Sequence, residues 1–318
     1  MILLFTAMEG LMWKYVIKRL FASLLTLWIM FTLTFFLMHL TPGSPFLGDS
    51  KITPGILANL EAKYGLDKPL LVQYKMYAMN ILKGDLGESI KLSGQSVGEI
   101  IARKFPYSLK LGLFSSAIAI IFGTILGTIS ALKKNTAGDR VIMFFVTVGI
   151  AVPSFVVATV SMVLFGVKWR IFPTVSHLDS LSSYILPGFA LSFFSLSFIT
   201  RLMRSSMLDV INQDYIRTAR AKGLSEKVVI FKHGLRNGIL PVVTYAGPMI
   251  AGVVTGSFVI ESIFSIPGLG SSFVTSITAK DYPTVMGVTI FYGALIIFMN
   301  FLVDIIYRFV DPRINITN

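Results

Sequence analysis

Six long apolar runs divide this chain, and its charged side chains gather in the segments between them. Each run is uncharged and reaches or exceeds the roughly 20 residues that an α-helix needs to cross the hydrocarbon of a bilayer. The runs cover residues 20–40, 111–132, 141–167, 180–200, 237–260 and 282–303. This pattern predicts an all-α membrane protein with six transmembrane helices.

The positive charges fall unevenly between the two sides that six crossings would define. The termini and the loops on their side carry sixteen Lys or Arg, whereas the two short loops on the opposite side carry three. Short loops rich in Lys and Arg stay in the cytoplasm. We therefore expect both termini to be cytoplasmic. The first apolar run is too long for a cleaved signal peptide, and residues 1–11 before its basic cluster form an extension to which no function is assigned.

Three parts follow from this pattern. Residues 1–40 form the cytoplasmic N-terminus and the first span, residues 41–110 an external segment, and residues 111–318 the remaining five spans. Helical spacing of apolar residues and two prolines at candidate helix starts predict an amphipathic helix pair in the external segment. Such a pair is either a platform for an extracellular partner or a lid over the spans. The residues concerned are Pro54, Pro69, Leu70, Tyr74, Tyr77 and Ile81.

The polar segment between the fourth and fifth runs, residues 201–236, is called the basic loop here. It carries eight Lys or Arg against three acidic residues, a net charge of +5. Apolar or small residues recur at helical spacing on both sides of Gly223, which predicts a helix, a turn and a second helix. The first face is Ile211, Tyr215, Thr218 and Ala219, and the second is Val228, Phe231, Leu235 and Ile239. Beyond the role of a charged topogenic anchor, a small-residue helix suits docking into a partner's groove.

Composition narrows the function. The chain is 54% hydrophobic with a mean hydropathy of +0.75, and its net charge of +12 is explained by loop topology, so nucleic acid is not expected as a partner. The sequence has no cysteine and no phosphate-binding GxxxxGK[ST] motif. His39, His177 and His233 lack the spacing of metal ligands. We therefore expect no enzyme active site, no metal and no cofactor in this chain.

Small residues in the second and fifth runs predict close helix packing. The candidates are Ala119, Gly123, Gly127, Gly252 and Gly256. Asp304 is the acidic residue that stands closest to the interior of a run, and Arg308 one turn later predicts a structural ion pair with it. An external hairpin, residues 261–281, contains SIPGLG from Ser265, which predicts a tight turn.

The sequence QDYIRTARAKGLS in the basic loop resembles the EAA loop of ABC importer permeases, and it is similar to that loop in the peptide-importer branch. Where the broad family has Glu-Ala-Ala, this chain has Arg217, Thr218 and Ala219, so the acidic residue is missing. The resemblance implies that the loop docks on a cytoplasmic ATPase. The docking residues it implies are Asp214, Tyr215, Arg217, Thr218, Ala219, Arg220, Ala221, Lys222 and Gly223.

Further stretches are similar to the oligopeptide permease B subunit, among them TFFLMHLTPGSPF from Thr34 and TGSFVIESIFSIPGLGSS from Thr255. The resemblance implies a type I ABC importer permease fold and a gating role for Pro267, Gly268 and Gly270. It also implies four kinds of partner: a homologous C-type permease, two ATPase subunits that hold ATP and Mg²⁺, an extracellular or periplasmic peptide-binding protein, and the peptide. The expected cellular location of the protein is a prokaryotic cell membrane.

Two alternatives stay open on the sequence. A nickel or metal-chelate ABC importer uses closely related permeases. An ion-coupled secondary transporter would work without an ATPase but needs ionisable residues inside the membrane, for which Asp304 is the candidate.

Overall fold

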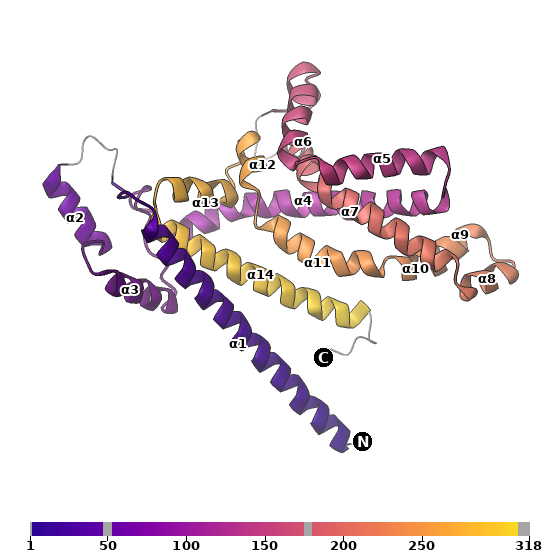
Figure 1. Ribbon diagram of the computed structural model, residues 1–318, viewed down its shortest axis with the longest axis horizontal. Helices are drawn as coiled ribbons and strands as arrows, with labels where there is room; N and C mark the ends of the chain where they lie inside the picture. Colours follow the sequence, from indigo (N-terminus) through magenta and orange to yellow (C-terminus); the bar gives the residue numbers. More distant parts are fainter. Residues whose placement is uncertain (1, 47–52, 175–179, 311–318) are drawn as a thin grey trace. The chain divides into compact units, whose positions relative to one another are not determined.

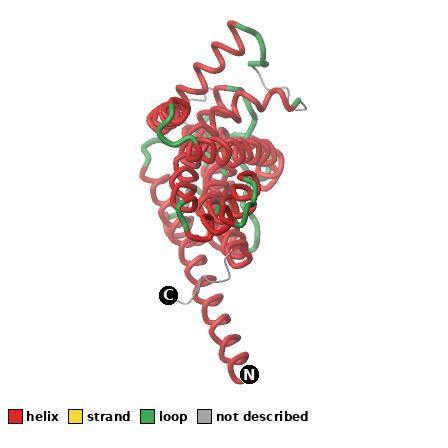
Figure 2. Tube along the Cα trace, turned by 90° about the vertical axis from the view of Figure 1, so that its right-hand side faces the viewer, coloured by secondary structure: helices red, strands yellow, loops and turns green. Residues whose placement is uncertain are grey.

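The computed structural model describes residues 2–46, 53–174 and 180–310, with side chains from Ile17 to Leu302. Within these ranges the chain is almost wholly helical (Figure 2). Contacts divide it into two compact units. Unit 1 is Met1–Lys104, Ser272–Phe298 and Arg313–Asn318, and unit 2 is Phe105–Ser271 and Met299–Pro312. In this division the first span and the segment after it share a unit with residues 272–298.

The helices follow one another along the chain as labelled in Figure 1. Those built largely from unit 1 are α1 (Ile2–Leu40), α2 (Pro54–Tyr64), α3 (Leu70–Leu82) and α14 (Tyr282–Val310). The long helix that begins in unit 1 and continues into unit 2 is α4 (Val97–Leu132). The remaining elements are α5 (Ala137–Ala151), α6 (Ser154–Ser161), the π-helix η1 (Met162–Lys168), the 3₁₀-helix η2 (Leu181–Tyr184), α7 (Ile185–Ile211), α8 (Asp214–Ala221), α9 (Glu226–Val228), the π-helix η3 (Val229–Gly234), α10 (Leu235–Gly238), α11 (Leu240–Val254), α12 (Phe258–Ile263) and α13 (Leu269–Thr278).

Four described helical segments are long and apolar enough to cross a membrane, and the number rises to six if each of two bent pairs is one span. The all-α expectation is confirmed, and the six-span expectation holds when the bent pairs are counted. One pair, α5 with α6 and η1, turns by 109°. Pro153 stands between these helices and lacks the N–H that would continue the first of them. The apolar run over residues 141–167 is therefore divided between two helices near its middle.

Unit 1 is held by contacts of α1 and α14 with the segment between α1 and α4. The buried side chain of Asp281 accepts hydrogen bonds from the Ser89 hydroxyl, from the Ile90 amide at 3.0 Å and from the Thr284 hydroxyl at 2.8 Å. Asp281 immediately precedes α14, so one carboxylate is hydrogen-bonded both to the first turn of that helix and to the loop before α4. The predicted helix starts at Pro54 and Pro69 are found there, at α2 and α3.

In unit 2, two glycines on α4 allow α7 to approach closely. A Cβ at Gly123 would lie 2.7 Å from Ile199 Cγ2, and one at Gly127 would lie 2.6 Å from the Thr200 carbonyl oxygen. Ala119, one turn earlier, is fully buried. These residues lie where α4 and α7 approach each other closely.

The two later glycines of that prediction are placed differently. Gly252 is in α11, and no neighbouring atom of the chain lies within 4 Å of a Cβ built there. Gly256 lies beyond the end of α11 with a φ of +88°, so it forms a turn where we expected a helix face. Its lack of a side chain leaves room for the carboxylate of Glu261.

We predict that Gly127→Ala destabilises unit 2 by about 1–3 kcal/mol, the usual cost of overpacking. The added methyl would meet the α7 backbone, which cannot move aside as a flexible side chain can. Thermal unfolding of the purified protein measures this effect. Gly98→Ala is the control because it lies on the same helix and has open space around it. Equal stability of the two variants would contradict the close contact.

Candidate functional site

The basic loop contains a short exposed helix, α8, followed by a turn and the helices α9, η3 and α10. Gly223 has a φ of +76°, a conformation that glycine adopts without strain, and it ends the first helix as predicted. Arg220 donates from Nε to Glu226 Oε1 at 2.8 Å and from Nη2 to Glu226 Oε2 at 3.4 Å, which closes the turn. Asn237 Nδ2 donates to the Tyr215 hydroxyl at 2.8 Å and ties α8 to α10. The loop is a folded unit rather than a loose connection.

The face by which α8 packs differs from the predicted one. Ile216 and Ala219 are buried and cluster with Val229 and Val210, while Tyr215 and Thr218 are exposed. After the turn, the π-helix η3 adds a residue to one helical turn and shifts the register, so Val229 is buried while Phe231 is 65% exposed. Sequence spacing missed Val229 because it assumed a regular helix after the turn, and it missed Ile216 because it placed Tyr215 and Thr218 on the packed face of α8.

The outer surface of the basic loop combines exposed apolar side chains with basic ones. Tyr215, Leu224, Val228 and Phe231 are exposed. The same segment also exposes five cationic side chains, namely Arg217, Arg220, Lys222, Lys227 and Lys232. Ala221, Lys222 and Gly223 are also exposed, and Asp214 starts the helix with a side chain that is almost fully exposed. Large apolar side chains exposed together with charged ones on a folded segment are typical of a surface that binds another protein.

A second candidate site surrounds the buried carboxylate of Glu261 on α12. Ser108 Oγ donates to Glu261 Oε1 at 2.7 Å, and the Ser271 amide donates to Oε2 at 2.7 Å. The Leu269 amide donates to Ser108 Oγ at 2.8 Å. Burial raises the pKa of the Glu261 carboxyl, and the hydrogen bonds from Ser108 and the backbone act against that rise. This network binds the predicted SIPGLG turn to α4.

Three glycines make room for that carboxylate. A Cβ at Gly256 would lie 2.5 Å from Glu261 Oε1, one at Gly270 would lie 3.1 Å from Oε2, and one at Gly268 would overlap the carboxyl group. Pro267 is exposed on the same turn, while Gly268 and Gly270 are buried. Pro267, Gly268 and Gly270 are candidates from the sequence, whereas Glu261 is not. The turn also leads into α13, a helix that the sequence pattern did not predict.

A buried ion pair joins α5 to α7. Arg204 donates from Nε to Asp139 Oδ1 and from Nη2 to Oδ2, both at 2.8 Å. Asp139 also accepts from Ser130 Oγ at 2.5 Å and from the Asn135 amide at 2.9 Å. The sequence pattern marks Arg204 only as one of the loop charges, and it singles out Asp304 and not Asp139 as the acidic residue of interest. The side chains of Asp304 and Arg308, and residue His177, lie outside the described residues.

These two acids bear on the choice between transporter classes. Both Asp139 and Glu261 are buried, yet each has its oxygens occupied by donors from the chain itself. Ion-coupled transport needs a carboxylate that can exchange its partner for the ion. Among the residues whose side chains are described, no group of three or more His, Asp or Glu could hold a metal ion.

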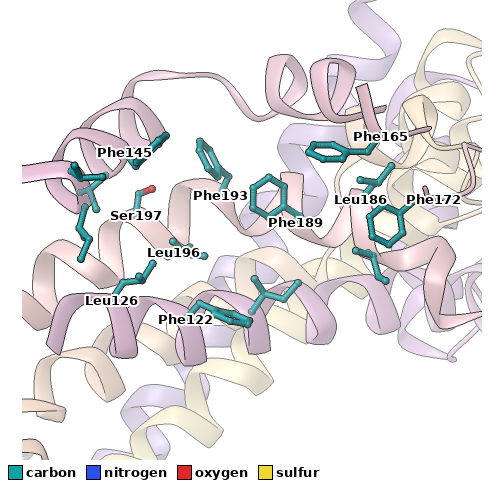
Figure 3. A pocket seen from close by; sticks show the side chains of 15 residues that line it. Phe122, Leu126, Phe145, Phe165, Phe172, Leu186, Phe189, Phe193, Leu196 and Ser197 are labelled. Carbon is teal, nitrogen blue, oxygen red and sulfur yellow. The ribbon is translucent and has the colours of Figure 1, made fainter. Parts of the chain in front are cut away.

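An apolar cavity of about 610 Å³ lies between α4, α5 and α7 (Figure 3). Phe122, Phe145 and Phe193 are among its lining residues, and Ser197 supplies a hydroxyl. A peptide carries a donor and an acceptor at each residue, and burying them unpaired against such a lining costs several kcal/mol in total, at about 1–3 kcal/mol each. The cavity therefore does not fit a peptide-binding site.

Comparison with known proteins identifies the family. Residues 123–316 match the family "Binding-protein-dependent transport system inner membrane component", and residues 12–112 match its N-terminal family. The dipeptide transport system permease protein DppB of Bacillus subtilis (strain 168) is 45% identical over 95% of this chain and 98% of its own length. The oligopeptide transport system permease protein OppB of Haemophilus influenzae is 44% identical over 95% of this chain and 99% of its own. OppB of Salmonella typhimurium is 41% identical over the same shares.

Solved structures agree on the fold. A chain of the MetNI methionine ABC transporter, in inward-facing conformations, aligns with a TM-score of 0.54 at 17% identity, over 67% of this chain and 96% of that one. The resemblance stated from the sequence and the ABC importer permease fold are thus confirmed. The chain belongs to the family of inner membrane components of binding-protein-dependent transport systems.

Proposed function

We propose that this chain is the transmembrane subunit of an ATP-driven importer and forms half of the translocation pathway for peptides. Relatives that match it nearly end to end carry names of dipeptide and oligopeptide permeases. Its partners would be a homologous C-type permease, two ATPases with their ATP and Mg²⁺, and an external peptide-binding protein. This assignment places both termini and the basic loop in the cytoplasm and the SIPGLG turn on the outside, at the gate of the pathway.

The observation that carries the coupling role is the folded, exposed surface of the basic loop. Helix α8 is tied to the rest of the loop by the Arg220–Glu226 ion pair and by the Tyr215–Asn237 hydrogen bond. A helix that transmits force must keep its conformation while its partner moves, and these contacts hold the conformation of α8. Docked on an ATPase, α8 would pass the closure of the ATPase dimer to the membrane helices and drive alternating access.

No observation favours the two alternatives over this proposal. A metal-chelate importer would share the fold and the loop. For an ion-coupled transporter, the buried carboxylates with described surroundings are already occupied by partners from the chain.

The test is Ala221→Trp in the transporter reconstituted with its partner subunits. Ala221 is exposed on α8, so we expect the bulky ring to leave folding unchanged and to block docking. Peptide uptake and peptide-stimulated ATP hydrolysis should both fall at least about tenfold, which corresponds to about 1.4 kcal/mol of lost docking free energy. Ala219 is unsuitable, because it is buried and its replacement would disturb the loop itself.

Ser93→Trp serves as the matched control, since Ser93 is exposed in the loop before α4. It should retain both activities. Uptake that persists in Ala221→Trp, or uptake that proceeds without any ATP-hydrolysing subunit, would overturn the proposal.

A further inference from the structure

Helix α3 carries apolar side chains on the face that points away from α1 and α14. Its inner face consists of Gln73, Tyr74, Tyr77, Ala78 and Ile81. On the opposite arc, Leu71 and Leu82 are 73% and 76% exposed. The same arc holds Val72, Lys75, Met76 and Met79. A helix with large apolar side chains on both its inner and its outward face is rarely stable in water, so we expect a further surface to cover this arc.

The contacts of α3 with α1 show how deep it lies. Tyr74 packs against the rings of Trp28, Phe31, Phe35 and Phe36. Its hydroxyl is 2.8 Å from the hydroxyl of Thr32. Thr32 precedes the end of α1 by eight residues, which is about 12 Å at the rise of an α-helix. The polar atoms at this contact pair with each other, as groups away from water must.

Helix α14 provides an independent marker of depth. Ala78 on α3 is buried in one cluster with Met286 of α14, and Ile290 packs against the same cluster. These two residues follow the start of α14 at Tyr282 by four and eight positions, or about 6 and 12 Å. Because the side chain of Ala78 is a single methyl, the α3 backbone itself lies at this depth.

The position of the bilayer along α1 follows from its charges. Lys18 and Arg19 end the charged start of the helix, and the chain from Leu20 to Leu40 contains no Lys, Arg, Asp or Glu. A hydrocarbon core of about 30 Å takes about 20 helical residues, so its far boundary lies near Leu40. The contacts of α3 with Thr32 and Phe31 therefore lie inside the hydrocarbon, about 12 Å from its boundary.

We infer that α3 is embedded in the leaflet reached by the C-terminal end of α1, and that its outward arc contacts lipid acyl chains. Leu71, Met79 and Leu82 form the contact, and Lys75 extends its ammonium toward the headgroups. This surface is an alternative to a platform for a soluble protein. The inference depends on the contacts of unit 1 alone and stands whether or not the chain moves peptides.

The absence of cysteine from the chain makes a direct test simple. Leu71→Cys, Met79→Cys and Leu82→Cys are labelled singly with a nitroxide in the full-length chain, in nanodiscs of phosphatidylethanolamine and phosphatidylglycerol. Oxygen concentrates in hydrocarbon, whereas a water-soluble nickel chelate stays in water. The ratio of oxygen collisions to nickel collisions with the label therefore rises with the depth of the label in the bilayer. The reference for lipid is Leu33→Cys on the exposed side of α1, and the reference for water is Ser93→Cys.

We expect the three α3 labels to give ratios close to that of Leu33→Cys and well above that of Ser93→Cys. Ratios equal to that of Ser93→Cys would overturn the inference in favour of an aqueous surface. Labels shielded from both reagents would overturn it in favour of a protein partner. Each label is placed on an exposed side chain, so the variants test the surroundings of α3 and not its packing.

Discussion

Replacing Arg204 with methionine is expected to lower the free energy of unfolding by about 3–5 kcal/mol, the cost of leaving a buried charge without its partner. The side chain of Asp139 is only 5% exposed, and that of Arg204 is 22% exposed. Methionine keeps much of the length of arginine but removes both hydrogen bonds to the carboxylate. The ion pair joins the start of α5 to α7, so its loss also frees the helix that leads into the basic loop. Thermal unfolding of the purified protein and the yield of folded protein in the membrane measure the effect.

A second substitution separates the loss of the pair from the loss of packing. Asp139→Leu combined with Arg204→Met removes both charges, and we expect it to be less destabilising than either single change, since apolar replacement of a buried ion pair is often close to neutral. Arg201→Met is the control because Arg201 is exposed on the same helix, and its effect should stay within about 0.5 kcal/mol. A double variant as unstable as the sum of the single ones would show that the pair does not act as a unit.

The parts of this structure that sequence could predict are local. Uncharged runs of sufficient length indicated the spans, since a bilayer requires a fixed length of apolar helix. Gly223 marked the break in the basic loop because a positive φ favours glycine. Pro54 and Pro69 marked helix starts because the proline ring restricts the backbone to conformations that suit the beginning of a helix.

The parts that sequence could not predict depend on tertiary contacts. Asp139 and Arg204 are 65 residues apart, and nothing in either neighbourhood signals that the two side chains meet. The register of the basic loop changed because η3 has a π-helical turn, which hydrophobic spacing does not reveal. The 109° bend at Pro153 exceeds the kink that a proline within one helix would produce.

The SIPGLG turn could be predicted from the sequence only in part. Its Pro-Gly pair predicted a turn, but the reason for two of its glycines is the carboxylate of Glu261, which a pattern search treats as an ordinary loop charge. A signal was available in hindsight: an acidic residue directly after an apolar run, followed closely by two glycines, can be enclosed by that turn. The proposed gate is therefore a turn held to α4 through Glu261 and Ser108.

Gly268→Ala is the sharpest test of that arrangement. The added methyl would overlap the Glu261 carboxyl group, which is fully buried and has no room to withdraw. We expect a loss of about 2–4 kcal/mol of stability, from overpacking together with the displaced hydrogen bonds to Ser108 and Ser271. If the turn gates the pathway, peptide uptake should fall as well. Gly252→Ala is the control, because Gly252 is a helical glycine in open space and alanine there should be neutral or stabilising by up to about 1 kcal/mol.

Removing the carboxylate should relieve the clash. In a background of Glu261→Ala, itself destabilising because the Ser271 amide loses its acceptor, the further change Gly268→Ala should cost much less than it does in the native chain. Unfolding of the four proteins in this double-mutant cycle gives the coupling between the two positions. A coupling near zero would mean that Gly268 does not make room for Glu261. A large coupling, with uptake impaired in both single variants, would establish that the buried carboxylate positions the turn through which we propose that peptides enter.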